Sequence, residues 1–479
     1  MMFRARRFLF LPASGLLLGA CTSLRSGLDV TDAGSDAGSD AALDAALDAA
    51  LDAGSDAPLD LADASPDGGD AGPNVPIAIA AGGYSTCVVL AHGDLYCWGL
   101  NENGQVGNGA TPGDNVEQPA LVATDVTGKP FGEVAQVAVG AVHACALKRS
   151  GDVYCWGRGD QGGLGDEVTQ HNVASPQKVA GVSGYTAVGI GAGGFATCGL
   201  DGASRVYCWG SNFKSRLGHA IGTNGDVPNT SLPEDDNPNP VAVQSLGPVT
   251  SLALGAYFSC ATDDAGVACW GEDQDGDPGV GAGELGDLGD AGDNTPVPLR
   301  VPAPPGVNHV GAGQSFACAW GDATGATCWG SDLYGELATG GFASPLGPTS
   351  LALGDASVVE MKGTYASLLA LTSDQTVWTS GYNGDGELAN GTTGQGQACG
   401  TDNGLVGGGQ SCLAWASQAR DSTGASTLKA THIAAGFLHA CAIGADQAVY
   451  CWGDNTYGQL GIGASGEGRG QPVKVVGLP

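Results

Sequence analysis

The sequence predicts an all-β fold, a seven-bladed β-propeller with four-stranded blades, preceded by a disordered acidic stalk. Three observations predict it. A unit built around a Trp-Gly pair returns at intervals of about 50 to 70 residues. Glycine accounts for 83 of 479 residues without a collagen period, which is typical of a chain with many tight turns. Charged residues make up only 14%, so long amphipathic helices are not expected.

Each unit begins with an apolar stretch, continues to a cysteine and reaches Cys-Trp-Gly about ten residues later, before an Asn/Asp-rich turn. The tryptophans are Trp98, Trp156, Trp209, Trp270, Trp329 and Trp452. Ser380 holds the same place in the sixth of the seven units. Several short strands in a unit of this length favour a propeller blade over a helical solenoid. The seven units form one predicted domain, 75–479.

The two ends of this domain suggest how the ring closes. The chain ends with a Pro-led strand at 472–478, and the domain begins with an apolar strand at 77–81. We expect the C-terminal strand to complete the first blade, which would protect strand edges that otherwise template aggregation.

The repeat resembles a known family. The pattern Gly-x-x-His-x-Cys-x-Leu at 140–147, followed by Trp156-Gly157, is similar to the repeat of the regulator of chromosome condensation family, and so is 452–461. The resemblance covers all seven units and implies a seven-bladed propeller. The repeat histidine is present only as His143 and His439, which predicts a packing role for it.

Fifteen cysteines are present, and twelve form pairs inside the repeat, where each pair is expected to bridge a hairpin. The expected pairs are Cys87 with Cys97, Cys145 with Cys155, Cys198 with Cys208, Cys260 with Cys269, Cys318 with Cys328, and Cys441 with Cys451. Zinc would need C-x-x-C or histidine partners, which do not occur here.

The sixth unit lacks such a pair. It has Leu368 or Leu369 and Thr379 in the two positions, and its long following loop carries Cys399 and Cys412. We expect these two cysteines to bridge each other and to close the loop.

The remaining cysteine, Cys21, ends a basic and then apolar segment typical of an export signal, 1–21. Leu18-Gly-Ala-Cys21 resembles the lipobox of bacterial lipoproteins, which implies lipidation of Cys21, and the absence of Asp after it implies outer-membrane delivery. An ordinary secretory signal is the alternative. Residues 22–74 follow, with Asp at every fourth position from Asp32 to Asp60. This composition predicts a disordered stalk, in which specific cation binding is the less favoured interpretation.

The charge of the chain limits its partners. The formal net charge is −32, and 73–479 contains 14 basic and 38 acidic residues. A nucleic-acid partner is therefore not expected, because binding to phosphates needs a basic surface. No catalytic motif is evident, so an enzyme is not predicted. Asp273, Asp275, Asp277 and Glu284 match part of a calcium-loop template, although Pro278 replaces its glycine and two of these acids belong to the ordinary turn; no other cofactor is expected.

A binding face is the favoured functional site. The position three residues before the first cysteine of each unit is often aromatic, and equivalent positions of a propeller lie on one ring. These residues are Tyr84, Val142, Phe195, Tyr257, Ser315, Tyr365 and Leu438. The candidates for the face are Tyr84, Phe195, Tyr257, Tyr365, Leu438 and Trp415, because aromatic residues are enriched in interface hot spots. Packing between blades is the alternative.

The sequence therefore predicts a monomeric, membrane-anchored module that binds a protein, peptide or glycan through its loops. An inhibitor of a secreted enzyme is the alternative, since some exported bacterial propellers of the resembled family inhibit β-lactamase. Guanine-nucleotide exchange, the activity of the eukaryotic namesake, is disfavoured by the predicted export and the acidic charge.

Overall fold

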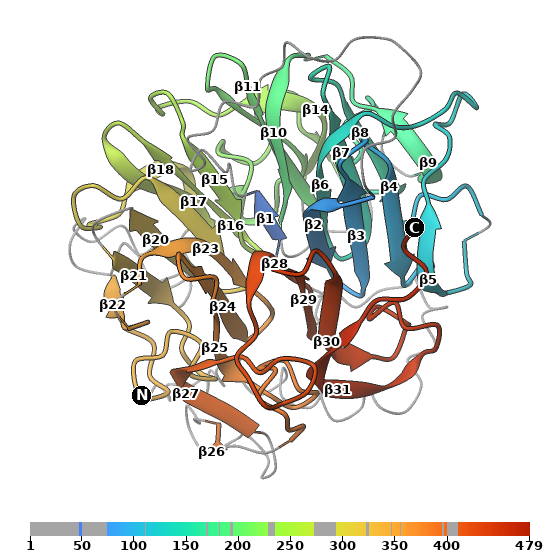
Figure 1. Ribbon diagram of the computed structural model, residues 1–479. Helices are drawn as coiled ribbons and strands as arrows, with labels where there is room; N and C mark the ends of the chain where they lie inside the picture. Colours follow the sequence, from blue (N-terminus) through green and yellow to red (C-terminus); the bar gives the residue numbers. More distant parts are fainter. Residues whose placement is uncertain are drawn as a thin grey trace, which may run out of the picture.

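Seven antiparallel sheets, one per sequence unit, stand around a central axis in the computed structural model (Figure 1). The structure describes residues 47–49 and 74–479, except 111, 169–170, 182, 192–194, 229–234, 273–293, 322–324, 346, 355, 395–396 and 400–410. In these ranges the secondary structure is strands and one short 3-10 turn, η3 (Phe213–Ser215). The predicted all-β, seven-bladed propeller is confirmed.

Each blade contains four strands that follow one another in the chain from the axis outward. Blades 1 and 2 are β2 (Pro76–Gly82), β3 (Ser85–Leu90), β4 (Leu95–Gly99), β5 (Val116–Leu121), and β6 (Val134–Val139), β7 (His143–Lys148), β8 (Val153–Arg158), β9 (Asn172–Lys178). Blades 3 and 4 are β10 (Tyr185–Ile190), β11 (Ala196–Asp201), β12 (Val206–Ser211), β14 (Asp235–Ala242), and β15 (Ser251–Leu254), β16 (Phe258–Asp263), β17 (Gly266–Glu272), β18 (Asn294–Arg300).

The other three blades follow the same plan. Blade 5 is β19 (His309–Ala312), β20 (Phe316–Gly321), β21 (Gly325–Gly330), β22 (Thr349–Leu351). Blades 6 and 7 are β23 (Val358–Gly363), β24 (Ser367–Thr372), β25 (Val377–Tyr382), β27 (Ser411–Gln418), and β28 (Ala430–Ala435), β29 (His439–Gly444), β30 (Val449–Asn455), β31 (Gly466–Lys474). Three short strands are added to this plan: β1 (Leu47–Ala49) pairs with β15, β13 (Val227–Pro228) with β14, and β26 (Gln397–Ala398) with β27.

The expected closure of the ring through a shared blade is wrong. The C-terminal strand β31 pairs with β30, so it completes blade 7, and blade 1 is completed by its own β5. Each blade is thus built from one continuous stretch of chain. The prediction failed because a Pro-led strand fits the outermost position of either blade, and the sequence pattern is the same for both.

Disulfides join the second and third strands of six blades, and their pairing is the predicted one. In each of them the two cysteines stand directly opposite each other in the strand register, with Cα atoms 4.0–4.1 Å apart. The bridges are Cys87 to Cys97, Cys145 to Cys155, Cys198 to Cys208, Cys260 to Cys269, Cys318 to Cys328, and Cys441 to Cys451.

Blade 6 is the exception that the sequence predicted. Its opposed pair is Leu369 and Thr379, which settles the choice left open between Leu368 and Leu369. The bridge between Cys399 and Cys412 instead closes the segment between β25 and β27, as expected. The hairpin disulfides therefore reinforce every blade except the sixth.

Among the described residues, one type of hydrogen bond recurs at six of the seven junctions between adjacent blades. The indole N–H of a buried tryptophan donates to a backbone carbonyl in the preceding blade, in a turn with the pattern Gly/Ser-x-Leu/Val-Gly/Ala. The pairs are Trp156 with Gln105 at 2.8 Å, Trp209 with Gly163 at 3.0 Å, Trp270 with Arg216 at 2.9 Å, Trp452 with Glu387 at 2.7 Å and Trp98 with Gln459 at 2.8 Å. In blade 6 the Ser380 hydroxyl replaces the indole and donates to the Glu336 carbonyl at 2.7 Å.

The glycine after each tryptophan is required by a close approach to the inner turn of its own blade. Gly157 has φ +105°, and a Cβ there would lie 2.6 Å from the Val142 carbonyl oxygen. Both the left-handed backbone and the close approach exclude other residues. This explains why Gly381 remains in blade 6, with φ +102°, although its tryptophan is absent.

The junction between blades 7 and 1 closes the ring without strand exchange. The Trp98 indole spans it, and Thr86 Oγ1 lies 2.9 Å from His439 Nε2. His143 makes the equivalent contact with Thr197 of the next blade at 2.7 Å. Burial lowers the pKa of His439 to about 3, so its ring is neutral. The packing role predicted for the repeat histidine agrees with these contacts.

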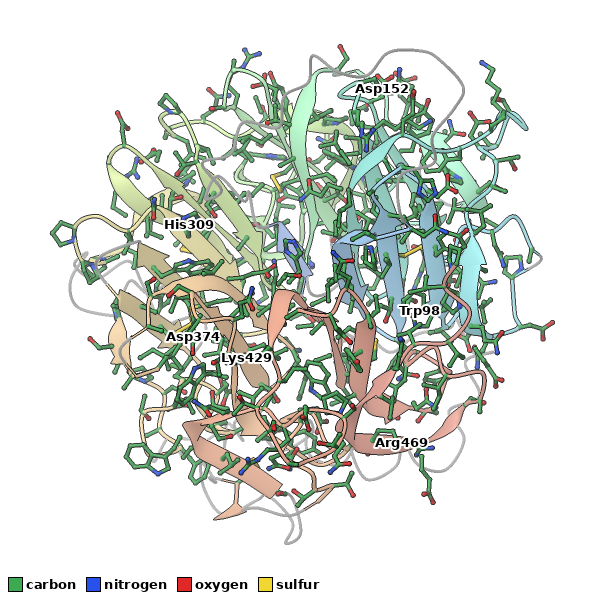
Figure 2. The ribbon with its side chains drawn as sticks, viewed as in Figure 1. Trp98, Asp152, His309, Asp374, Lys429 and Arg469 are labelled. Atoms are coloured by element: carbon green, nitrogen blue, oxygen red, sulfur yellow. A yellow bond between two sulfur atoms is a disulfide. The ribbon has the colours of Figure 1, made fainter. Side chains whose placement is uncertain are left out.

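Replacing Trp98 tests the ring-closing bond. Trp98 is fully buried at the junction (Figure 2), and Trp98→Phe removes the N–H donor and part of the packed ring. We expect a loss of about 2–4 kcal/mol in the free energy of unfolding, measured by urea denaturation. Trp415→Phe is the matched control, because the Trp415 side chain is 60% exposed, and it should change stability by less than about 0.5 kcal/mol. Equal effects would contradict the role given to the bond.

Candidate binding face

The alternating strand directions place two kinds of connection on one face of the ring. The turns between first and second strands lie there, close to the axis, and so do the loops between third and fourth strands. We call this side the loop face. The opposite face carries the turns between second and third strands and the links from one blade to the next. The two faces are thus built from different parts of each repeat.

The residues predicted to share a ring lie in the inner turns of the loop face. Backbone hydrogen bonds connect consecutive turns: Gln314 N–H donates to Thr364, Tyr365 N–H to Phe437 and Phe437 N–H to Gly83, at 2.8–3.2 Å. We call the seven positions Tyr84, Val142, Phe195, Tyr257, Ser315, Tyr365 and Leu438 the annulus. Tyr84 and Val142 are buried, and the other five are half-buried.

On blades 5, 6, 7 and 1 the annulus belongs to a larger aromatic cluster. The Tyr84 ring lies 5.6 Å from Phe437 and 4.8 Å from Tyr457, and the Tyr365 ring lies 4.8 Å from Phe437 and 6.1 Å from Tyr334. Tyr334 also packs edge-on against Tyr382 at 5.8 Å. Tyr84 therefore packs between blades, as the alternative interpretation predicted, and Tyr365 is half-buried. None of the seven annulus side chains is fully exposed.

Sequence reasoning missed Tyr334, Tyr382, Phe437 and Tyr457. Tyr334 and Tyr457 each stand five residues after the tryptophan of their repeat, in the loop between third and fourth strands. A search of that second repeat position would have found them. The sequence pattern does not show that the loop between third and fourth strands folds back over the inner turn.

On blades 2 and 3 the same face holds cations over its aromatic rings. The Arg216 guanidinium lies 4.9 Å from the centre of the Tyr257 ring and 5.6 Å from that of Phe213. It also donates to the Ala256 carbonyl at 2.8 Å. Arg158 lies 5.5 Å from the Phe195 ring. These contacts show that the annulus can hold guanidinium groups against its rings.

The long loop of blade 3 contains a His–Asp pair whose role, we infer, is to stabilise the loop. His219 Nε2 is 2.8 Å from Asp226 Oδ1, and the same carboxylate accepts bonds from Asn212 at 2.9 Å and Asn237 at 3.1 Å. Burial opposes the charge of Asp226, but these hydrogen bonds outweigh it and lower its pKa. The carboxylate is fully used in closing the loop.

Blade 6 presents two further features. Its loop between β25 and β27 is the longest of that blade and is bridged by the disulfide of Cys399 and Cys412. Trp415 follows on β27 and lies against Gly340 of blade 5, where a Cβ would meet its ring. Equivalent outer-strand positions hold Ser175, Gln118 and Gln471, each beside the corresponding glycine. An exposed tryptophan thus replaces a polar residue on the outermost strand of the blade, whereas the annulus residues lie in the inner turns.

The other sequence predictions have no structural outcome. Asp273, Asp275, Asp277 and Glu284, proposed for calcium, lie outside the described residues, as does Cys21. Among the residues that the structure describes, no group of three or more His, Cys, Asp or Glu side chains is placed to hold a metal ion. The same part of the chain contains no helix that is long and apolar enough to cross a membrane.

Seven four-stranded sheets in a ring, joined through a repeated buried tryptophan, define a seven-bladed β-propeller. Part of the chain matches repeats of the regulator of chromosome condensation (RCC1) type. Two models of this repeat match the chain, one at 77–105, 134–162 and 430–459, the other at 92–147, 150–200, 204–262 and 446–479. The resemblance of the repeats is thereby confirmed for the matched residues, which lie in blades 1 to 4 and in blade 7.

Relatives share part of the sequence with this chain, and solved structures share its fold. The chain is 28% identical over 399 residues to the ultraviolet-B receptor UVR8 of Arabidopsis thaliana, covering 81% of this chain and 79% of UVR8. It is 28% identical over 327 residues to the human E3 ubiquitin-protein ligase HERC2, covering 66% of this chain but only 6% of HERC2. Prp20p from Saccharomyces cerevisiae has the same fold, with a TM-score of 0.63 at 20% identity over 81% of this chain and 87% of that chain. Human WBSCR16 gives a TM-score of 0.61 at 19% identity, covering 80% and 94%.

Two substitutions separate packing from surface roles in the annulus. Tyr84 is 6% exposed and contacts two rings, so Tyr84→Ala should cost about 3 kcal/mol or more in the free energy of unfolding. Tyr365 is half-buried, and Tyr365→Ala should cost clearly less and leave the circular dichroism spectrum unchanged. Chemical denaturation measures both; a larger loss for Tyr365→Ala would place that ring in the core instead.

Proposed function

We propose that this protein is a binding propeller that recognises a protein partner through its loop face while a lipid on Cys21 holds it at a bacterial membrane. The observation that supports it most is the aromatic cluster of the annulus, carried half-buried on inner turns that hydrogen bonds hold to one another. Rigid aromatic side chains give a large contact area at low entropic cost, which is why they dominate interface hot spots.

Related propellers support a protein as the partner. Prp20p is described by its binding to Gsp1p and histones, and yeast RCC1 (Prp20) also occurs in a complex with Kap60. The acidic charge of the present chain favours a partner surface rich in Lys and Arg, because complementary potentials steer encounter and select partners. Arg158 and Arg216, already seated over annulus rings, illustrate how such cations would be held.

The topology favours presentation of the loop face away from an anchor. The first strand of blade 1 begins at Pro76 on the opposite face and reaches the loop face at Gly82. A stalk that precedes Pro76 therefore joins the domain on the side opposite the annulus. Part of the chain before Pro76 also returns to the ring, because β1 (Leu47–Ala49) pairs with β15, the innermost strand of blade 4.

Affinity capture from the native envelope tests the proposed face. The full-length protein carrying Tyr365→Ala and Trp415→Ala should lose a discrete partner that the wild type retains, with at least about a tenfold drop in recovered partner. Val126→Ala is the control: this valine is 44% exposed in the link between blades 1 and 2, on the opposite face. Equal capture by both variants would refute a loop-face partner.

The proposed anchor has a separate test. Expressed in a bacterial host fed labelled palmitate, the wild-type chain should incorporate label and sediment with the membranes. Cys21→Ser should do neither, since stable attachment of such a chain depends on acylation. Unlabelled wild-type protein released into the soluble fraction would overturn the anchor and leave the binding face untouched.

A further inference from the structure

The loops of blades 5 and 6 carry buried acids at a position where blades 1 and 7 carry amides. The residue just before the Leu or Val of this turn is Gln105 in blade 1 and Gln459 in blade 7, but Glu336 in blade 5 and Glu387 in blade 6. Blades 2 and 3 have Gly163 and Arg216 there. Gln105, Gln459 and Glu387 have no exposed surface, and Glu336 is 2% exposed. The chain therefore places carboxyl groups in a site shaped for a neutral amide.

The hydrogen bonds of the acids and the amides correspond at one atom. Gln459 Oε1 accepts the Tyr457 N–H at 2.8 Å, and Glu336 Oε2 accepts the Tyr334 N–H at 2.7 Å. The two residues differ at the second atom: Gln459 Nε2 donates to Asp454 Oδ2 at 2.9 Å, whereas Glu336 Oε1 accepts from the Ser331 hydroxyl at 3.2 Å. A protonated carboxyl reproduces the amide, because it has one acceptor and one donor. An ionised carboxylate has acceptors only.

Blade 5 repeats the exchange at a second position. In four blades an asparagine side chain accepts the backbone N–H of the Leu or Val that stands five residues later in the loop. These asparagines are Asn101, Asn212, Asn383 and Asn455. In blade 5 the residue at this position is Asp332, which accepts the Leu337 N–H at 2.8 Å. The Asp332 side chain is buried and also accepts the Thr339 hydroxyl. Two acids four residues apart thus share one buried loop.

The groups that face these acids are acidic or neutral. Glu336 faces Asp332, Ser331 and Tyr334 of its own loop, and Ser380 of blade 6 bonds its backbone carbonyl. Glu387 faces Asp385 of its own loop and Asp454 of blade 7.

β31 of blade 7 packs against the same loop of blade 6 and contributes Arg469. Its guanidinium donates to the carbonyls of Glu467 and Gly468 at the exposed surface. The cation on the neighbouring element is therefore directed to the surface and its hydrogen bonds are with its own strand.

We propose that Asp332, Glu336 and Glu387 form a proton-operated latch, which holds the loops of blades 5 and 6 closed when the acids are protonated and loosens them when the acids ionise. The loops carry Tyr334 and begin at Tyr382, so loosening them changes the aromatic cluster of the loop face. That consequence for binding rests on the proposed function, whereas the latch itself does not.

The pKa shifts give the direction of the effect. Burial is the largest cause in each case: it raises the pKa of Glu336 to about 8, that of Asp332 to about 6, and that of Glu387 well above its usual range. The folded state then binds more protons than the unfolded chain between the ordinary carboxyl pKa near 4 and the raised value. Stability therefore falls as pH rises through this window and is lowest above about pH 8.

A triple variant that restores the amides tests the latch. Asp332→Asn, Glu336→Gln and Glu387→Gln install residues that other blades already hold, so the variant should fold. Between pH 6 and pH 9 the thermal midpoint of the full-length wild type should fall by about 5 °C more than that of the variant. The control, Glu102→Gln with Asp114→Asn and Glu467→Gln, removes three exposed acids and should keep the wild-type slope.

Hydrogen–deuterium exchange of the segment 329–341 gives a local readout. Wild type and Glu336→Gln are compared at the same pH, so that intrinsic exchange rates cancel. At pH 9 the wild-type segment should exchange at least about tenfold faster than the variant, and at pH 6 the two should agree. The latch would be overturned if the thermal midpoints of wild type and triple variant changed equally with pH and the exchange rates of wild type and Glu336→Gln were equal at both pH values. Neither measurement uses a partner, so failure here is distinct from failure of the binding face.

Discussion

The fold depends on one hydrogen bond repeated around the ring, from a tryptophan indole in one blade to a loop carbonyl in the preceding blade. A propeller blade buries one sheet face against each neighbour, so the junction between blades is where the domain is held together. The indole fills that junction with a large apolar ring and satisfies a buried carbonyl that would otherwise be costly. Because the acceptor lies in the third-to-fourth-strand loop, the same bond also fixes the loops of the binding face.

Blade 6 departs from this plan in several connected ways. Its interblade donor is the Ser380 hydroxyl, and Leu369 and Thr379 stand where other blades have a disulfide. A serine retains the hydrogen bond but not the apolar area of the indole, so the junction between blades 5 and 6 is held by less buried surface. The disulfide of this blade lies in the loop instead, between Cys399 and Cys412. In this blade the disulfide therefore stabilises a loop of the proposed binding face and not the hairpin.

The sequence predicted the repeat, the blade count and the disulfides because each rests on local spacing. A Cys-Trp-Gly return strand determines which cysteine opposes which, because the register of a hairpin follows from the length of its turn. The sequence did not predict which blade β31 completes, because a Pro-led outer strand fits both ends of the ring. It also found only two of the six rings of the aromatic cluster: Tyr84 and Tyr365 belong to one repeat position, whereas Tyr334 and Tyr457 come from another that tertiary folding brings beside it.

At the turn position held by Gln105 in blade 1, the backbone has the same structural role wherever the structure describes this turn, whereas the side chain differs from blade to blade. The backbone carbonyl accepts the next blade's donor whether the residue is Gln105, Gly163, Arg216 or Glu387. The side chain is therefore not constrained by the interblade bond, and each blade uses it differently. Arg216 places a cation over Tyr257, and Gln459 closes its own loop. Glutamate at this position costs desolvation unless it is protonated, so its presence in two neighbouring blades adds a sensitivity to pH that amides would not have. Blades 5 and 6, where these acids lie, also carry Tyr334, Tyr382 and the bridged loop, which makes this part of the loop face the most specialised region of the ring.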